Sequence, residues 1–309
     1  MKILITGSNG LLGQKLVYKL RNNAAVTCIA TARGENRLAK QEGYVFESLD
    51  ITNKENVNNV FSKHLPDVIV NTAAMTNVDA CETEKDACWA MNVTSVNHQV
   101  KALENLKIKH SNYNPHFIHL STDFIFDGTH GPLDENETPN PLSYYAESKL
   151  AAEKIVQASL LDWAIARTVL VFGIVDNMSR SNIVLWVKSN LEQGKIINVV
   201  DDQFRTPTLA EDLADGCILI AQKRAKGIYN ISGKDFYSIL ELANVVADYY
   251  QLDKSLIKPS KSADIKQPAK RPPITGFIIE KAKKELGYNP HSFTDGIKIL
   301  EEQIKEMGK

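Results

Sequence analysis

Residues 7–13 read GSNGLLG and directly follow the short apolar run Lys2–Thr6, which has the length and composition of a buried strand. Leucine and valine then recur at helical spacing, so the glycine segment joins a predicted strand to a predicted helix. Gly7 permits a tight turn, Gly10 lets the backbone approach a pyrophosphate, and Gly13 lets the helix pack closely on the sheet. We therefore predict a dinucleotide-binding turn, and a glycine-rich turn without a ligand is the alternative. The contacts expected from it are Gly7, Asn9, Gly10, Leu11, Leu12 and Gly13.

The first half of the chain alternates strand and helix patterns. This alternation is typical of parallel strands joined by right-handed crossovers, and the apolar strands indicate a sheet covered on both faces. We expect an α/β fold with a Rossmann-type, doubly wound parallel sheet. After residues 2–6, the predicted strands are 26–31, 44–49, 67–71, 116–121 and 163–172, and the predicted helices include 79–106, with a capping box of Asp79 and Glu82, and 145–160.

The second half indicates a smaller C-terminal α/β lobe for the substrate. We assign residues 1–172 to an NAD(P)-binding domain and 173–309 to the substrate lobe, with a strand at 227–231 rejoining the main sheet. The cleft between the lobes is the expected active site. Further predicted elements are helices at 181–191, 209–223, 279–286 and 294–307, a strand at 196–200, and an irregular connection at 254–273.

Composition and charge exclude several classes of protein. The formal net charge is -1, so no basic excess is available to bind nucleic acid. No apolar stretch reaches 18 residues, so we expect no membrane span, and the N-terminal run is too short for a secretory signal. The spacing of the four cysteines, Cys28, Cys81, Cys88 and Cys217, indicates no disulfide framework, so we expect reduced thiols in the cytoplasm.

The residues after the second predicted strand bear on the choice of cofactor. NAD-selective sites usually place an acidic residue there to bind the ribose 2′-hydroxyl, but this chain has Arg33, with Arg37 nearby. The arginines favour the 2′-phosphate of NADP(H), with NAD(H) as the alternative, and two solvated arginines are the other interpretation. The remaining cofactor contacts are expected from Asp50 and Ile51 near the adenine, and from Asn71, Ala73 and Ala74 after the fourth strand.

Tyr145 and Lys149 are spaced i, i+4 at the start of a predicted helix, so both lie on one face. A lysine ammonium beside a phenol lowers the pKa of the phenol, which suits it to proton transfer. Thr122 and Asp123 stand at the end of the fifth predicted strand, the edge where such sheets bind ligands. We predict that Thr122 binds a substrate carbonyl and that Asp123 orients this network. An ordinary surface pair is the alternative interpretation of Tyr145 and Lys149.

Together these motifs resemble the extended short-chain dehydrogenase/reductase family, and within it most closely the dTDP-4-dehydrorhamnose reductases. The similarity runs from residue 1 to about 290. It implies transfer of a hydride from NAD(P)H to the C4 keto carbon of a dTDP-linked 6-deoxysugar. It further implies that Tyr145 donates the proton, that Lys149 tunes Tyr145 and holds the nicotinamide ribose, and that Thr122 polarises the carbonyl. Besides the glycine turn and Tyr145-x-x-x-Lys149, the motifs that carry it are 121–128 (STDFIFDG), 71–74 with 78–79, 166–168, 202–203 with 206–208, 212–214 and 271–272.

The chain departs from the pattern of this family where the substrate is expected. Phe124 replaces a tyrosine, Leu170 stands near the place of a tryptophan, and Arg205 replaces a glycine. Arg205 either binds a diphosphate or carboxylate or is merely exposed, while Arg271 is the preferred ligand of a substrate phosphate. The expected substrate contacts are Thr76, Phe124, Leu170, Arg205 and Arg271.

Other functions and partners stay open at this point. A nucleotide-sugar epimerase or dehydratase would use the same scaffold, and the non-catalytic regulatory subunit of methionine adenosyltransferase resembles the same family. The resemblance allows Mg²⁺, but no carboxylate cluster supports it, and His116 and His119 should face opposite sides of a strand, so we predict no metal site. A homodimer through the long helices is compatible with Ala87, Met91 and Val156, although these residues could equally face the sheet.

Overall fold

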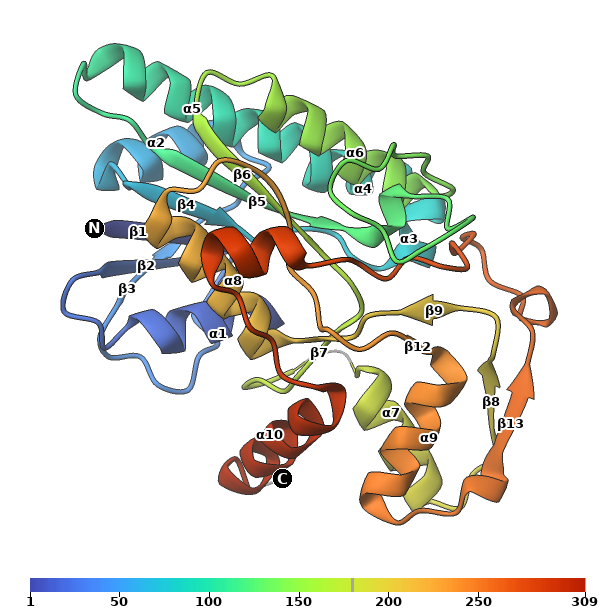
Figure 1. The fold of residues 1–309 in the computed structure, drawn as a ribbon. Helices are drawn as coiled ribbons and strands as arrows, with labels where there is room; N and C mark the ends of the chain where they lie inside the picture. The colour runs from blue at the N-terminus through green and yellow to red at the C-terminus, as the bar shows by residue number, and fades with distance from the viewer. Residues whose placement is uncertain (179–180, 309) are drawn as a thin grey trace.

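The fold is built on a seven-stranded parallel sheet with the order β11-β6-β5-β4-β1-β2-β3 (Figure 1). The computed structural model describes residues 1–178 and 181–308. This order reverses direction between β1 and β4, so their carboxyl ends open a crevice for ligands. The predicted Rossmann-type α/β fold is confirmed. The strands are β1 Lys2–Thr6, β2 Thr27–Ala32, β3 Val45–Ser48, β4 Val68–Asn71, β5 His116–Thr122, β6 Asp162–Thr168 and β11 Gly227–Asn230.

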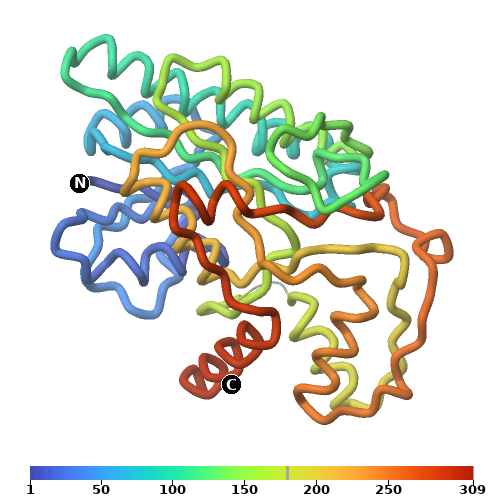
Figure 2. Tube along the Cα trace, viewed as in Figure 1, coloured from blue at the N-terminus to red at the C-terminus, as the bar shows by residue number. Residues whose placement is uncertain are grey.

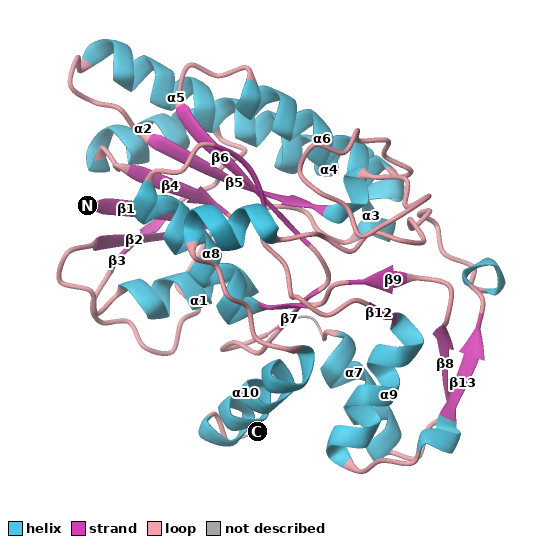
Figure 3. Cartoon of the chain, in the orientation of Figure 1, coloured by secondary structure: helices cyan, strands magenta, loops and turns pink. Residues whose placement is uncertain are grey.

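Helices cover both faces of this sheet (Figure 3). On α1, Leu16, Val17 and Leu20 are fully buried at helical spacing and pack into the same core as the apolar face of α8. The opposite face carries a second core, to which α2, α5 and α6 contribute. The burial on both faces explains why the strands read as continuous apolar runs. The bounds are α1 Leu11–Leu20, α2 Lys54–His64, α5 Ser95–Lys109, α6 Tyr144–Gln157 and α8 Ala210–Lys223.

A smaller lobe with its own apolar core lies beside the carboxyl edge of the sheet (Figure 2). Its helices are α7 Ile183–Glu192, α9 Ile239–Tyr250 and α10 Phe293–Glu306, and its strand pairs are β8 Ile197–Val200 with β13 Ile257–Ser260 and β9 Phe204–Arg205 with β12 Tyr237–Ser238. A third pair, β7 Val171–Phe172 with β10 Thr208–Leu209, links the lobes. Both α8 and β11 lie after residue 173 yet pack on the large sheet, so the chain passes between the lobes more than once.

The single helix expected over residues 79–106 is wrong. Glu84 leaves the helical region, with φ -114° and ψ 53°, and divides the segment. Asp79 is also not the N-cap of this segment. The side chain of Asn77 caps it by accepting a hydrogen bond from the Ala80 N–H, and Asp79 forms an ion pair with Arg271. The segment consists of α3 Val78–Thr83, α4 Lys85–Trp89, the π-helical turn Ala90–Thr94 and α5.

Two other expectations are also corrected. The strand expected over residues 163–172 is interrupted, because Leu170 adopts a left-handed φ of 39° that turns the chain between β6 and β7. The connection at 254–273 is not wholly irregular, because the strand β13 forms within it. The helix expected at 279–286 is mostly a π-helical turn, which spans Ala282–Leu286. The sequence patterns also missed α9.

Candidate active site

A cavity of about 910 Å³ opens at the carboxyl ends of β1, β4 and β5 and reaches the small lobe. Its walls include the glycine turn, the segment after β4, the start of α6, and residues of both lobes. Most of the predicted site residues come together here, although they are far apart in the sequence. These are Gly7, Asn9, Gly10, Leu11, Leu12, Gly13, Arg33, Ala73, Ala74, Thr76, Thr122, Asp123, Phe124, Tyr145, Lys149, Leu170, Arg205 and Arg271.

The glycine turn at one end of the cavity is shaped by close backbone contacts. Gly7 has φ +71°, and a Cβ on it would lie 2.9 Å from the backbone of Ala73. A Cβ on Gly13 would lie 2.3 Å from the carbonyl oxygen of Gly7. At Gly10 the nearest atom, the same oxygen, would be 3.3 Å away. Gly7 and Gly13 are therefore required by the protein itself, whereas Gly10 leaves space open toward the cavity.

The beginning of α1 offers unused hydrogen-bond donors to this space. The Gln14 N–H donates to the Gly10 carbonyl at 2.9 Å and closes the first turn, so the preceding N–H groups have no carbonyl partner within the helix. Gly10 makes no side-chain cap. Such a helix end attracts anions, and the residues present fit the pyrophosphate of a dinucleotide.

The other expected cofactor contacts are less uniform. Arg33 and Arg37 are exposed and line the cavity, as a 2′-phosphate site requires. Asp50, Ile51 and Asn71 are not among the residues that line it. Asp50 accepts two hydrogen bonds from Thr52, which lower the pKa of its carboxyl group. The adenine contacts of Asp50 and Ile51 and the contact of Asn71 stay predictions.

Three polar side chains meet on the floor of the cavity. Ser143 caps α6 by accepting the N–H of Ala146 at 3.3 Å, which fixes the helix start that carries Tyr145. Burial raises the pKa of Tyr145, while a hydrogen bond with Thr122 acts to lower it. The Thr122 hydroxyl lies 3.0 Å from the Asp123 carboxylate oxygen Oδ1. The predicted proximity of Thr122, Asp123 and Tyr145 is therefore present.

The expected effect of Lys149 on the pKa of Tyr145 is wrong. Both side chains lie on α6, but the Lys149 ammonium donates to the Leu120 carbonyl at 2.6 Å and lies 3.4 Å from His119 Nε2. Burial lowers the pKa of Lys149 to about 8. The pKa of Tyr145 is thus raised rather than lowered, because desolvation outweighs its polar contacts and Lys149 is directed elsewhere.

The two arginines assigned to the substrate are already engaged by protein groups. Arg271 forms a bidentate pair with Asp79, with Nη1–Oδ1 at 3.2 Å and Nη2–Oδ2 at 2.7 Å, and it lowers the pKa of Asp79. Arg205 is buried, so the exposed alternative is wrong, and the carboxylate that it faces belongs to Asp123. Phe124 lies beside Tyr145 with the rings edge-on and their centroids 6.2 Å apart.

This site can be compared with known proteins. The model of the RmlD substrate binding domain family matches residues 1–306. The chain belongs to the RmlD substrate binding domain family. The dTDP-4-dehydrorhamnose reductase of Aggregatibacter actinomycetemcomitans is 30% identical over 97% of this chain and 98% of its own length. The methionine adenosyltransferase 2 subunit beta of Rattus norvegicus is 31% identical over 84% of this chain and 75% of its own length.

The fold of this RmlD-family protein also matches solved structures. A dTDP-4-dehydrorhamnose reductase from Clostridium acetobutylicum, at 26% identity, has a TM-score of 0.84 and covers 99% of this chain and 100% of that chain. Other neighbours, below 25% identity, share the fold and were solved with NADP or with NAD. The family resemblance and the class of NAD(P)-dependent oxidoreductase that the motifs predicted are confirmed.

Sequence reasoning missed part of the cavity wall of this RmlD-family protein. Ser121 lines the cavity, and its buried hydroxyl has no hydrogen-bond partner within residues 1–178 and 181–308. Its place beside Thr122 was the available signal. Gln203 also lines the cavity, and its place in the motif 202–203 was a further signal. Asn177 and Asn182 line it as well, but they come from a loop and a helix cap without a distinctive local pattern.

The described residues give no support to a metal site. Across these residues, no cluster of three or more His, Cys, Asp or Glu side chains is placed to hold a metal ion. His119 lies between the amide of Asn71 at 3.0 Å and the ammonium of Lys149.

Proposed function

We propose that this protein reduces the C4 keto group of dTDP-4-dehydrorhamnose to give dTDP-rhamnose, with NADPH as the preferred reductant. The observation that carries the proposal is the placement of Thr122, Tyr145 and Lys149 in the same cavity as the glycine turn. A reductase needs a proton donor and a dinucleotide cradle within one pocket, and this cavity supplies both. In this proposal residues 1–172 bind the cofactor, together with α8 and β11 that pack on the large sheet, and the rest of 173–309 forms the substrate lobe.

The residues of the cradle favour NADPH. The free N–H groups at the start of α1 would bind its pyrophosphate, and Arg33 and Arg37 would bind its 2′-phosphate. Bound there, NADPH supplies the hydride that the protein itself lacks. Lys149 would hold the nicotinamide ribose, which requires its ammonium to move from the Leu120 carbonyl.

The protein then has to supply one proton to the substrate oxygen. Because burial raises the pKa of Tyr145, the phenol stays protonated at neutral pH and is ready to act as an acid. An alkoxide forming at C4 is far more basic than a phenolate, so the transfer is favourable despite the raised pKa. Thr122 lies next to Tyr145 and would hydrogen-bond the same oxygen, and the sugar would lie against Thr76, Phe124 and Leu170.

The main competing function is that of a regulatory subunit. The rat methionine adenosyltransferase subunit is as similar in sequence as the bacterial reductase, at 31% against 30% identity. The bacterial reductase, however, matches nearly the full length of both chains, and Tyr145 and Lys149 of this chain both line the cavity. A protein that only bound a partner would not need this buried set. An epimerase or dehydratase is the third candidate, and it would show no net consumption of NADPH.

The test is a turnover assay with purified protein, dTDP-4-dehydrorhamnose and NADPH, followed at the nicotinamide absorbance. We expect Tyr145→Phe to lower kcat by at least about a hundredfold, the scale of general acid catalysis. Tyr144→Phe is the matched control, because Tyr144 packs against Trp89 outside the cavity and should leave the rate unchanged. Wild-type turnover in Tyr145→Phe would remove Tyr145 from the mechanism. Absence of turnover together with tight binding of a partner protein would support the regulatory function instead.

Location and assembly are further parts of this proposal. None of the described helices is long and apolar enough to cross a membrane. The four cysteines are buried and unpaired, which supports a reducing compartment such as the cytoplasm. Of the residues considered for a homodimer, Val156 is buried in the core under the sheet, Met91 packs partly against it, and Ala87 is exposed. The interface of a homodimer would therefore include Ala87 and its exposed neighbours, but not Val156.

A further inference from the structure

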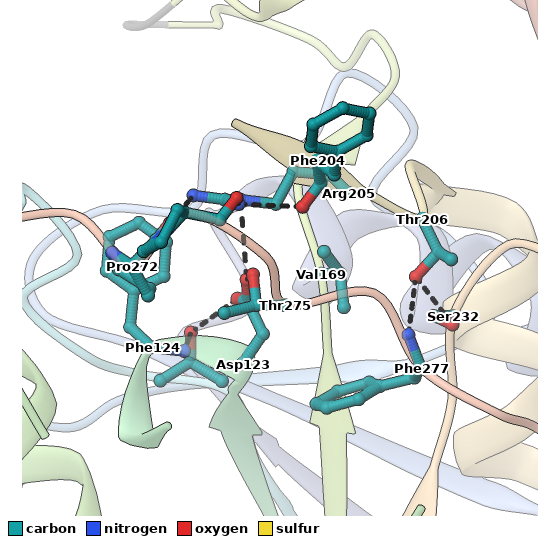
Figure 4. Close-up of polar contacts among 12 residues, drawn as sticks. Asp123, Phe124, Val169, Phe204, Arg205, Thr206, Ser232, Pro272, Thr275 and Phe277 are labelled. Carbon is teal, nitrogen blue, oxygen red and sulfur yellow. Dashed lines mark hydrogen bonds and ion pairs between the residues drawn. The ribbon is translucent and has the colours of Figure 1, made fainter. Parts of the chain in front are cut away.

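Contacts between the two lobes adjoin different parts of the cavity. Beside Tyr145, Arg205 of the small lobe places Nε 3.6 Å from Oδ2 of Asp123 in a buried ion pair (Figure 4). Residues 173–178, which follow β7 at the start of the small lobe, instead run beside α1 (Figure 1). There they contact the loop that carries Arg37, at the predicted site of the 2′-phosphate.

This loop has little support of its own. Arg33 and Arg37 belong to residues 33–44, which connect β2 to β3. Parallel strands are usually joined through a helix. Residues 33–44, all of which are described, form no helix, and only Leu38 among them is buried. Since a loop with so few buried apolar contacts is easily displaced, the position of Arg37 has to come from hydrogen bonds.

The glycine turn holds one side of the loop. Asn9 Oδ1 accepts the Arg37 N–H at 2.9 Å, and Asn9 Nδ2 donates to the Glu35 carbonyl at 2.8 Å. Both ends of the Asn9 amide are therefore engaged by the loop, which ties it to the place expected for the pyrophosphate.

Residues 176 and 177 hold the other side of the loop. Asp176 Oδ2 accepts the Ala39 N–H at 3.0 Å and also the hydroxyl of Tyr18 on α1. Asn177 Nδ2 donates to the Arg37 carbonyl at 3.2 Å. Both backbone polar groups of Arg37 are thus bound by side chains of other segments, and one of these segments belongs to the small lobe.

The support that residues 173–178 provide is itself firmly anchored. Gln14 on α1 is buried and pairs twice with the backbone of Asp176, donating to its carbonyl at 2.9 Å and accepting its N–H at 3.2 Å. Ile174 packs in the core of the small lobe. Burial and the hydrogen bond to Asp176 raise the pKa of Tyr18 to about 12, so its hydroxyl remains a donor at neutral pH. Asn177 has a left-handed φ of 50°, which asparagine adopts more readily than most residues.

We propose that Asp176 and Asn177 are positioning residues for the choice of cofactor, which hold Arg37 at the cavity so that it can bind a 2′-phosphate. This inference rests on the proposed function, because it takes NADPH to be bound at Arg33 and Arg37. It gives the small lobe a part in selecting the cofactor as well as in binding the sugar. The carboxylate of Asp176 would by its charge repel a phosphate, so its contribution is to the backbone of the loop.

The test uses two probes that carry the adenosine end of the cofactor, adenosine 2′,5′-bisphosphate and 5′-AMP, with dissociation constants measured by NMR titration. We expect Asp176→Ala to weaken binding of the bisphosphate by about threefold to tenfold, the scale of ordering one arginine and its loop, and to leave 5′-AMP almost unchanged. In Asp176→Asn, one amide oxygen can accept both hydrogen bonds that Oδ2 accepts, so the bisphosphate should bind at least as tightly as in wild type. Should Asp176→Ala fail to fold, Asn177→Gly keeps the left-handed φ, removes the bond to Arg37, and should give a smaller loss of the same kind.

A second step shows whether the effect passes through Arg37. On an Arg37→Ala background, Asp176→Ala should cause no further loss of bisphosphate binding. A further loss of the same size there, or equal losses for both probes in Asp176→Ala, would overturn the inference. A wild type that prefers the bisphosphate, together with an Asp176→Ala protein that prefers it as strongly, would overturn the inference alone. A wild type that binds both probes equally would contradict the NADPH preference of the proposed function, and the inference with it.

Discussion

Gly13→Ala is expected to damage both the fold and the binding of NADPH, whereas Gly10→Ala should damage binding alone. A Cβ at position 13 would lie 2.3 Å from the Gly7 carbonyl oxygen, about 1 Å closer than ordinary van der Waals contact allows. It would also lie 2.7 Å from Cα of Ser8, so the turn between β1 and α1 has to move as a unit. Overpacking of this kind costs about 1–3 kcal/mol, and the better helix propensity of alanine returns about 1 kcal/mol.

The net cost of Gly13→Ala is therefore up to about 2 kcal/mol, which corresponds to a melting temperature lower by up to about 8 °C. Gly10→Ala meets only one protein atom, at 3.3 Å, and its methyl group points into space that we assign to the pyrophosphate. It should change the melting temperature little and weaken NADPH binding at least about tenfold, since a lost charged hydrogen bond is worth about 1.5–3 kcal/mol. Calorimetry and fluorescence titration measure the two quantities. A Gly10→Ala protein that binds NADPH as tightly as wild type would refute the placement of the pyrophosphate.

Two further predictions concern charged side chains of the cavity. Arg33→Ala should weaken NADPH binding by about 10- to 100-fold and leave NADH binding almost unchanged, because only NADPH carries the 2′-phosphate. Arg21→Ala is the control, since Arg21 pairs with Glu42 outside the cavity. If Arg33→Ala weakened the binding of NADPH and NADH equally, a contact between Arg33 and the 2′-phosphate would be contradicted. Because the pKa of Lys149 is lowered to about 8, the lysine is charged below that pH and neutral above it, so kcat/KM for reduction should fall as pH rises through about 8. Lys149→Met should be much slower and lack this limb, and an unchanged limb in that variant would assign it to another group.

The parts of the site that depend on local sequence could be predicted. The glycine turn follows from three positions within one strand–turn–helix unit, and the structure displays a conformational or packing reason for Gly7 and Gly13. The positions of Tyr145 and Lys149 follow from an i, i+4 spacing on one helix. The predicted lowering of the Tyr145 pKa was nevertheless wrong. The i, i+4 spacing shows neither the burial of Tyr145 nor the hydrogen bond that Lys149 donates to the Leu120 carbonyl.

The parts that depend on distant segments could not be predicted. Arg205 stood out in the sequence only as a replacement for glycine, and its partners, Asp123 and the carbonyls of residues 272 and 273, come from segments far along the chain. The pairing of Arg271 with Asp79 likewise crosses between lobes. The break at Glu84, with φ -114° and ψ 53°, lies within a segment whose apolar residues keep helical spacing, so periodicity gave no sign of it.

The most direct test of hydride transfer within this cavity is a labelling experiment. Purified protein is incubated with dTDP-4-dehydrorhamnose and NADPH deuterated at nicotinamide C4 on either face, and the sugar product is analysed by NMR and mass spectrometry. We expect one deuterium at C4 of dTDP-rhamnose from one of the two labelled cofactors, with Tyr145→Phe giving at least about a hundredfold less product in the same time. Conversion of the sugar without deuterium at C4, or retention of all label in the cofactor, would contradict the proposed reduction.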